Sequence, residues 1–81
     1  MGVVNHIKRV REAKGWSQSR LSRETYALFG PAGGITQGAI SNWEKGKHEP
    51  SLEAALKLCA ALQVSIWELF ELVLHQDSPA L

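Results

Sequence analysis

Apolar residues recur along the chain at intervals of three and four, the spacing that is typical of amphipathic helices. Five helices are predicted: about 4–14, one after Ser17, one after Thr36, one after Ser51, and a last one over 65–75. A hydroxyl side chain stands where each of the last four needs an N-cap, and Gly15, Gly30 and Gly46 end the first three. No alternating pattern predicts a strand. We therefore expect an all-α fold with five compact helices.

The spacing also predicts which side chains face the core. They are Ile7, Val10, Ala13, Leu21, Thr25, Leu28, Ile40, Trp43, Leu52, Ala55, Leu56, Cys59, Leu62, Ile66, Leu69, Phe70 and Val73. The last helix is apolar on further sides, where Trp67, Leu72 and Leu74 lie, so it needs a second covering surface. Two alternatives stay open: a dimer interface through these three residues, or extra packing against the first helix.

Length and composition set the broad class. Eighty-one residues, 44% of them hydrophobic, fit one small domain, which we expect over 1–76 with a disordered tail at 77–81. No apolar run is long enough to span a membrane and no signal peptide is visible, so we expect a cytoplasmic chain. The single cysteine, Cys59, is expected to be a buried, inert thiol.

The net charge of +1 hides an uneven distribution. Residues 1–48 hold eight Lys and Arg against three Glu, whereas residues 49–81 hold one Lys against five Asp and Glu. Such asymmetry suggests that one end of the molecule meets phosphate, although an ordinary solvated surface would look the same.

Catalytic and metal-binding patterns are missing from the sequence. His6, His48 and His75 are far apart and have no Cys or acidic residue at a ligand spacing. Gly33-Gly34 lacks the Gly-Lys-Ser/Thr of a phosphate loop, and Glu68 and Glu71 are spaced as a solvated helix face. We expect no enzyme, no metal and no cofactor.

The two helices between Ser17 and Gly46 form a helix-turn-helix arrangement. In the second of them Ile40 and Trp43 point inward, while an outward stripe carries small, amide and basic side chains: Gln37, Gly38, Ser41, Asn42 and Lys45. Gln and Asn amides can pair bidentately with adenine edges in the major groove, and short side chains at 38 and 39 allow close approach. Ordinary surface residues are the alternative.

Several ordered segments, 11–18, 35–47, 50–52 and 62–70, together resemble the phage-repressor/Cro-type (Xre-like) helix-turn-helix DNA-binding family. The resemblance covers about residues 7–70. It implies a compact five-helix, lambda-repressor-like domain that binds double-stranded operator DNA, usually as a two-fold homodimer.

The resemblance also implies roles for individual residues. Gln18 matches a phosphate clamp, Gln37, Gly38 and Asn42 match base-reading positions, Thr36 and Ser41 match phosphate or mixed contacts, and Lys45 and Lys47 match the basic end of the recognition helix. Ser17 and Ala39 complete the predicted DNA-binding set. Arg11 and Glu44 match an internal ion pair.

The chain departs from the family at two places. The turn from Gly30 to Ile35 has six residues where three or four are usual, and it is either a solvated bulge or a contact to the DNA backbone. Ser22 stands where the family usually has Ala, and we expect it to be tolerated.

The leading functional prediction is a sequence-specific transcriptional regulator, a repressor, that lays residues 36–45 in the major groove. The alternative is an antitoxin-like or other protein-interaction module that binds a partner protein through the apolar C-terminal helix.

Overall fold

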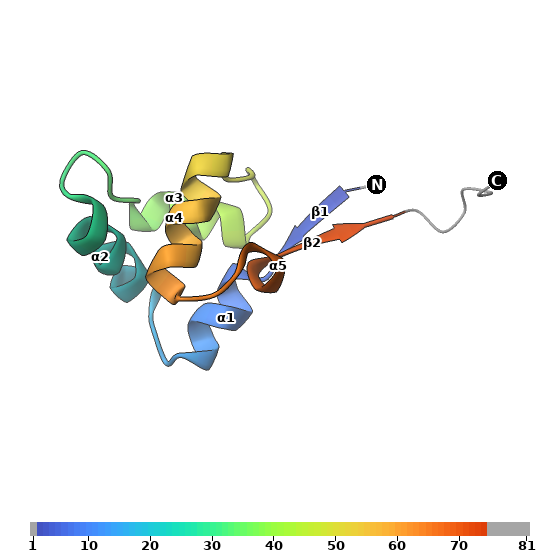
Figure 1. Ribbon diagram of the computed structural model, residues 1–81, viewed down its shortest axis with the longest axis horizontal. Coiled ribbons are helices and arrows are strands. Elements are labelled where there is room, and N and C mark those ends of the chain that lie inside the picture. The colour runs from blue at the N-terminus through green and yellow to red at the C-terminus, as the bar shows by residue number, and fades with distance from the viewer. Residues whose placement is uncertain (1, 75–81) are drawn as a thin grey trace.

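The computed structural model describes residues 2–74 and contains five helices and two strands (Figure 1). In chain order they are β1 (Gly2–Asn5), α1 (Ile7–Ala13), α2 (Gln18–Phe29), α3 (Gln37–Glu44), α4 (Leu52–Leu62), α5 (Ile66–Leu69) and β2 (Phe70–Val73). The expected domain boundary at 76 and the tail at 77–81 lie outside the described residues. None of the helices described over residues 2–74 has the length and apolarity to cross a bilayer.

The four helix starts predicted from hydroxyl caps are confirmed. The hydroxyls of Ser17, Thr36, Ser51 and Ser65 each accept a hydrogen bond from the backbone N–H three residues later. At α5 the side chain of Glu68 also accepts the Ser65 backbone N–H, which completes a capping box. These bonds satisfy N–H groups that a helix leaves free in its first turn, and they depend only on local sequence.

One hydrophobic core lies between the helices. Its fully buried large side chains come from all five of them: Ile7, Leu21, Ile40, Leu58, Leu62 and Leu69. Ala55 and Cys59 are buried as expected, but the predicted face of α4 is rotated, because Leu58 is buried while Leu52 and Leu56 are exposed. Leu28 of α2 is exposed as well, so its assignment to the core is wrong.

The expectation of an all-α fold without strands is wrong in one respect. Residues 2–5 and 70–73 pair as an antiparallel two-stranded sheet, in the register Val3 with Leu72 and Val4 with Glu71. The first helix therefore begins at Ile7 rather than near residue 4, and the last helix ends at Leu69 rather than at 75.

The chain leaves the helical path at Phe70, whose φ of −131° and ψ of 142° are those of a strand. Val73, expected in the core, is consequently exposed. Two bonds anchor the base of the sheet to the helices: the His6 backbone N–H donates to the Leu69 carbonyl (2.8 Å), and Asn5 Oδ1 accepts the Ile7 N–H (3.2 Å). The sheet projects from the helical body as a free ribbon (Figure 1).

Candidate nucleic-acid interface

Helix α3 is delimited at both ends by local hydrogen bonds. Thr36 Oγ1 accepts the Ala39 N–H at 3.2 Å at its start. At its end the Gly46 N–H donates to the Trp43 carbonyl (3.1 Å) and the Lys47 N–H to the Asn42 carbonyl (3.0 Å). This is a Schellman motif, and it requires the left-handed φ of +77° that Gly46 adopts. The motif fixes where Lys47 leaves the helix.

The two sides of α3 differ in burial. Ile40 is fully buried, and Trp43 and Ala39 pack against the core. On the other side Gln37, Gly38 and Lys45 are exposed, and Ser41 and Asn42 are partly exposed. A Cβ at position 38 would meet no atom within 4 Å, so the backbone there is open to close approach. The outward stripe predicted from the sequence is thus gathered on one side, whereas Ala39 faces inward.

A buried polar network holds α3 against α1 and α2. Arg11 forms a bidentate ion pair with Glu44, with Nε to Oε2 at 2.8 Å and Nη2 to Oε1 at 2.9 Å. Arg11 Nη1 also donates to the Trp16 carbonyl at 2.8 Å, and Gln18 Nε2 donates to Glu44 Oε1 at 2.9 Å. The side chains of Arg11 and Glu44 are only 8% and 4% exposed. This network sets the relative positions of α1, the start of α2 and the end of α3.

The network also determines the charge state of the pair. Burial alone would raise the pKa of Glu44, but the hydrogen bonds from Arg11 and Gln18 and the charges of Arg11 and Lys8 outweigh it and lower that pKa. The hydrogen bond to Glu44 raises the pKa of Arg11 above its ordinary value. Both groups are therefore charged, and they neutralise each other beside the outward stripe.

Gln18, the expected phosphate clamp, is partly buried and already bonded to Glu44. An amide NH₂ carries two hydrogens, so one N–H of Gln18 is left for another acceptor. The hydroxyl of Ser17 accepts the Arg20 backbone N–H at 3.0 Å and is exposed. The start of α2 thus presents an oriented amide and free backbone N–H groups on a helix that the ion pair ties to α3.

The long turn between α2 and α3 is attached to the body at several points. Thr25 Oγ1 accepts the Ile35 N–H at 2.8 Å, and Ser22 Oγ donates to the Ile35 carbonyl at 2.6 Å. Lys57 Nζ, on α4, donates to the Gly33 carbonyl at 2.9 Å. Ser22, expected only to be tolerated, therefore fixes the entry into α3. These bonds determine how α3 sits on α2 in spite of the added length.

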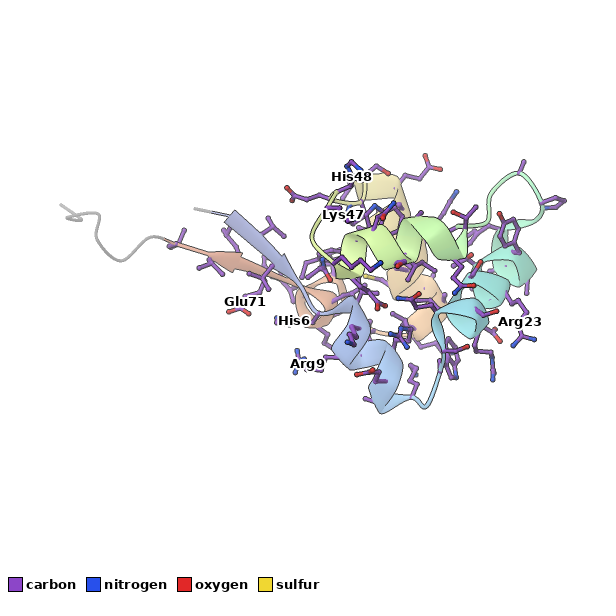
Figure 2. The ribbon with its side chains drawn as sticks, turned by 180° about the vertical axis from the view of Figure 1, so that it is seen from behind. His6, Arg9, Arg23, Lys47, His48 and Glu71 are labelled. Carbon is purple, nitrogen blue, oxygen red and sulfur yellow. The ribbon has the colours of Figure 1, made fainter. Side chains whose placement is uncertain are left out.

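Two residues near this surface were not among the predicted site residues. Asn5 Nδ2 donates to the Trp43 carbonyl at 3.0 Å, which ties the end of α3 to a segment 38 positions earlier. This role of Asn5 depends on a contact between residues far apart in sequence, so the sequence alone does not predict it. His48 is exposed beside Lys47 in the loop after α3, on the opposite side of the helical body from Arg9 in Figure 2. In the sequence, only its place in the basic loop after the third helix suggested that His48 lies near DNA.

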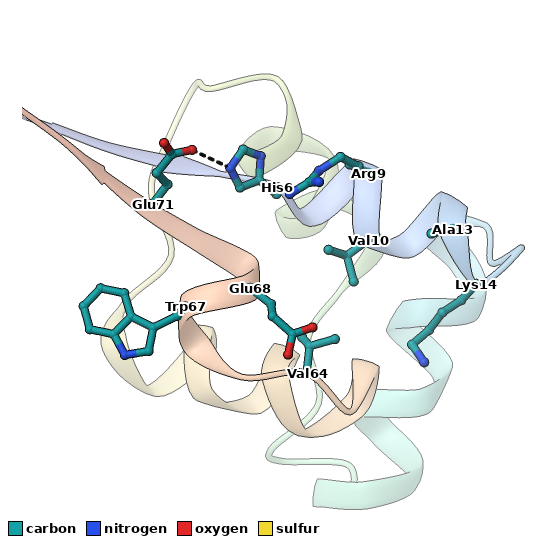
Figure 3. A pocket seen from close by; sticks show the side chains of 9 residues that line it. All are labelled: His6, Arg9, Val10, Ala13, Lys14, Val64, Trp67, Glu68 and Glu71. Carbon is teal, nitrogen blue, oxygen red and sulfur yellow. Dashed lines mark hydrogen bonds and ion pairs between the residues drawn. The ribbon is translucent and has the colours of Figure 1, made fainter.

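A groove lies away from α3. It has a volume of about 500 Å³ and lies between α1 and α5, with a basic rim from Arg9 and Lys14 and an acidic rim from Glu68 and Glu71 (Figure 3). His6 Nε2 and Glu71 Oε1 lie 2.9 Å apart across one end.

Within residues 2–74 no cluster of His, Cys, Asp or Glu is arranged to hold a metal ion. Cys59 is buried, and burial raises the pKa of its thiol, with the charge of Glu68 acting in the same direction.

Comparisons with known proteins agree with this geometry. Residues 7–69 match the Helix-turn-helix family. The chain is 34% identical over 68 residues to the HTH-type transcriptional regulator YgzD of Bacillus subtilis (strain 168), a match covering 84% of this chain and 91% of that protein. It is 33% and 31% identical over 64 residues to the antitoxin HipB of Escherichia coli O6:H1 (strain CFT073) and of Escherichia coli (strain K12). These matches cover 79% of this chain but 60% and 64% of the two antitoxins. The chain belongs to the Xre/Cro-like helix-turn-helix family of DNA-binding transcriptional regulators.

Proposed function

We propose that this protein is a sequence-specific repressor that binds a two-fold operator as a homodimer. Each subunit lays α3 in the major groove, and the two grooves lie on one face of the duplex, about 34 Å apart. Bound protein blocks access to the site, so repression follows from occupancy alone. The family and the regulator YgzD support DNA binding and regulation; dimerisation, the sign of regulation and the residue roles are our proposals.

The observation that carries the proposal is the two-sided burial of α3. Its inward side is fixed by Ile40 and by the Glu44 ion pair, so the outward side is held rigidly. The Asn42 side chain forms no hydrogen bond with any of residues 2–74, which leaves its amide free for a base edge. In this proposal Gln37 and Asn42 read bases, Gly38 permits the approach, and Thr36 and Ser41 contact phosphate or base.

Phosphate contacts are proposed to set the register on the duplex. Gln18 and the backbone N–H groups at the start of α2 contact phosphates at one position on the duplex. Lys45 and Lys47, at the C-terminal end of α3, contact phosphates at another. Ser17 contributes through its position at the cap. Of the eight Lys and Arg in residues 1–48, these proposed contacts use Lys45 and Lys47.

The test begins with selection of bound sequences from a random DNA pool, followed by binding measurements on the selected site. Asn42→Ala should cost about 1–3 kcal/mol on that site and relax the preference at one base pair in each half. Lys47→Ala should weaken binding to all sequences and flatten the salt dependence by about one unit of slope.

Arg9→Ala is the matched control for Lys47→Ala. It also removes one exposed positive charge, but Arg9 lies on α1 on the opposite side of the helical body (Figure 2). It should leave the salt slope unchanged. If Asn42→Ala and Lys47→Ala both bind the selected site as the parent does, α3 is not the reading helix.

A second function is suggested by the two HipB relatives, which are antitoxins. We propose it as the alternative: a DNA-binding antitoxin-like protein that also holds a partner protein. Co-expression with the product of an adjacent reading frame tests it. A complex that survives purification, together with relief of that product's toxicity, supports the alternative, and free components refute it.

A further inference from the structure

Asn5 lies at the junction of the ribbon, α1 and α3. It is the last residue of β1, where it pairs with Phe70, and it is partly buried. Asn is depleted in strands, because its amide competes for backbone groups, so an Asn at this position calls for a specific role. Both ends of the amide are engaged: Oδ1 accepts the Ile7 N–H at 3.2 Å, and Nδ2 donates to the Trp43 carbonyl at 3.0 Å.

The first of these two bonds begins α1. His6 occupies the N-cap position of α1, but its side chain makes no capping hydrogen bond. The Asn5 oxygen accepts the Ile7 N–H instead, in an Asx turn. A Ser or Asp side chain at position 5 has an acceptor for the same bond, so capping of α1 does not by itself require an amide.

The second bond needs an N–H donor, and it acts directly on the backbone of α3. The Trp43 carbonyl lies in the last turn of α3 and also accepts the Gly46 N–H at 3.1 Å, so Asn5 occupies its second lone pair. The next residue, Glu44, pairs with Arg11 in the last turn of α1. The end of α3 is therefore held at two points, by Arg11 and by the residue that precedes the start of α1.

These two attachments differ in stiffness. The ion pair joins α1 to α3 through two long side chains with many rotatable bonds, which can adapt to a small shift of the helix. The Asn5 bond joins the end of β1 to the backbone of α3 through one short side chain. The start of α3 is fixed separately, by the bonds of Ile35 to α2, so the direction of the helix depends on what holds its end.

We infer that Asn5 is a positioning residue for DNA reading, which holds the last turn of α3 so that Asn42 meets its base edge. This inference rests on the proposed function. Asn5 acts only through the Trp43 carbonyl and needs no contact with DNA. Hydrogen bonds to base edges weaken steeply with misalignment, whereas a flexible Lys can follow a phosphate. Loss of the Asn5 bond should therefore reduce specific binding more than non-specific binding.

The strength of one hydrogen bond sets the size of the effect. A typical intramolecular hydrogen bond changes a two-state population by about two- to tenfold, and a smaller population of the reading orientation lowers the apparent affinity by the same factor. Asn5→Ser keeps an acceptor for the Ile7 N–H but has no amide to reach Trp43. It should bind the selected operator about three- to tenfold more weakly. The salt slope should not change, because no charge is lost.

Binding to the selected operator and to an unrelated duplex of equal length measures the specificity ratio. Asn5→Ser and Asn5→Asp should each lower this ratio by about three- to tenfold. The added charge of Asp weakens binding to both duplexes, so it cancels in the ratio. Ala60→Gly is the matched control, because a glycine at this exposed position inside α4 lowers stability without touching α3. It should leave the ratio within about twofold of the parent.

Hydrogen exchange of the DNA-free protein separates this inference from the proposed function. In Asn5→Ser the N–H groups of Gly46 and Lys47, at the end of α3, should exchange about three- to tenfold faster, and the Gly30 N–H at the end of α2 should not. Unchanged exchange at Gly46 and Lys47, equal acceleration at Gly30, or a specificity ratio equal to that of the parent overturns the inference. A parent that selects no DNA sequence overturns the proposed function, and the exchange rates then decide whether Asn5 fixes the end of α3.

Discussion

The ion pair between Arg11 and Glu44 allows a prediction in which burial, not distance, decides the outcome. Glu44→Gln leaves the Arg11 guanidinium, 8% exposed, without a counter-charge. Breaking a buried pair costs about 3–5 kcal/mol, and the remaining amide oxygen can still accept one bond, so we expect a loss of about 3 kcal/mol. An 81-residue domain has a stability of about 4–12 kcal/mol, so the variant should melt roughly 12–24 °C lower.

The matched control is Glu24→Gln. The pair of Glu24 with Arg20 has the same 2.8 Å separation, but its side chains are 35% and 46% exposed. An exposed i,i+4 pair is worth about 0.3–0.5 kcal/mol, so this control should unfold almost like the parent. Urea and thermal unfolding at neutral pH, followed by circular dichroism, measure both. A difference of less than about 0.5 kcal/mol between the two variants would show that burial of the Arg11 pair is not important.

The same pair predicts a pH dependence. Because the pKa of Glu44 is lower in the folded chain, its contribution is complete above the unfolded pKa, which is near 4.5, and is lost as the pH falls through the folded pKa. The stability gap between the parent and Glu44→Gln should therefore narrow as the pH falls below about 4.5. Replacing both partners, as in Arg11→Met with Glu44→Leu, should destabilise less than Glu44→Gln alone, because no unpaired charge remains buried. A double variant less stable than the single one would refute the reasoning.

Three other changes probe the turn and the core. Thr25→Val leaves the buried N–H of Ile35 without its 2.8 Å acceptor, and urea unfolding should show a loss of about 1–3 kcal/mol. Gly34→Ala places a Cβ against the Tyr26 ring and should cost about 1–3 kcal/mol by overpacking, a loss that Tyr26→Ala should relieve; an additive double variant would contradict this. Cys59 is 8% exposed with a raised thiol pKa, so Ellman's reagent should label it only at the rate of unfolding. Labelling that is fast in native buffer would contradict its burial.

The sequence was sufficient wherever structure depends on neighbouring residues. The four hydroxyl caps and the glycine that ends α3 act within a few positions, so Ser17, Thr36, Ser51, Ser65 and Gly46 could each be read directly. The inward side of α3 followed from the spacing of two large apolar residues. The outward side, which the family resemblance links to DNA, was then determined by exclusion.

The face of α4 was harder to predict, because this helix is apolar on most of its surface. A stripe through Leu52 and Leu56 and a stripe through Leu58 both satisfy the helical period. The packing of α2 and α3 decides between them, and it buries Leu58. The hydrogen bonds that hold the long turn could not be predicted either, because they also depend on tertiary contacts. Bonds from Ser22 and Thr25 to Ile35 join residues ten or more positions apart.

The β1–β2 ribbon is the clearest case in which a contact between distant residues determines the secondary structure. Phe70–Val73 follows a capping box that predicts where a helix starts, but nothing in the local sequence predicts that it ends after Leu69. The segment becomes a strand because Gly2–Asn5, more than sixty positions away, supplies its partner. The change alters which side chains act together. On a helix Trp67, Leu72 and Leu74 would surround the axis, whereas the period of two of a strand places Leu72 with Val3 and Phe70, beside the exposed Trp67 ring. A dispersed set of apolar residues thus becomes one face of the ribbon.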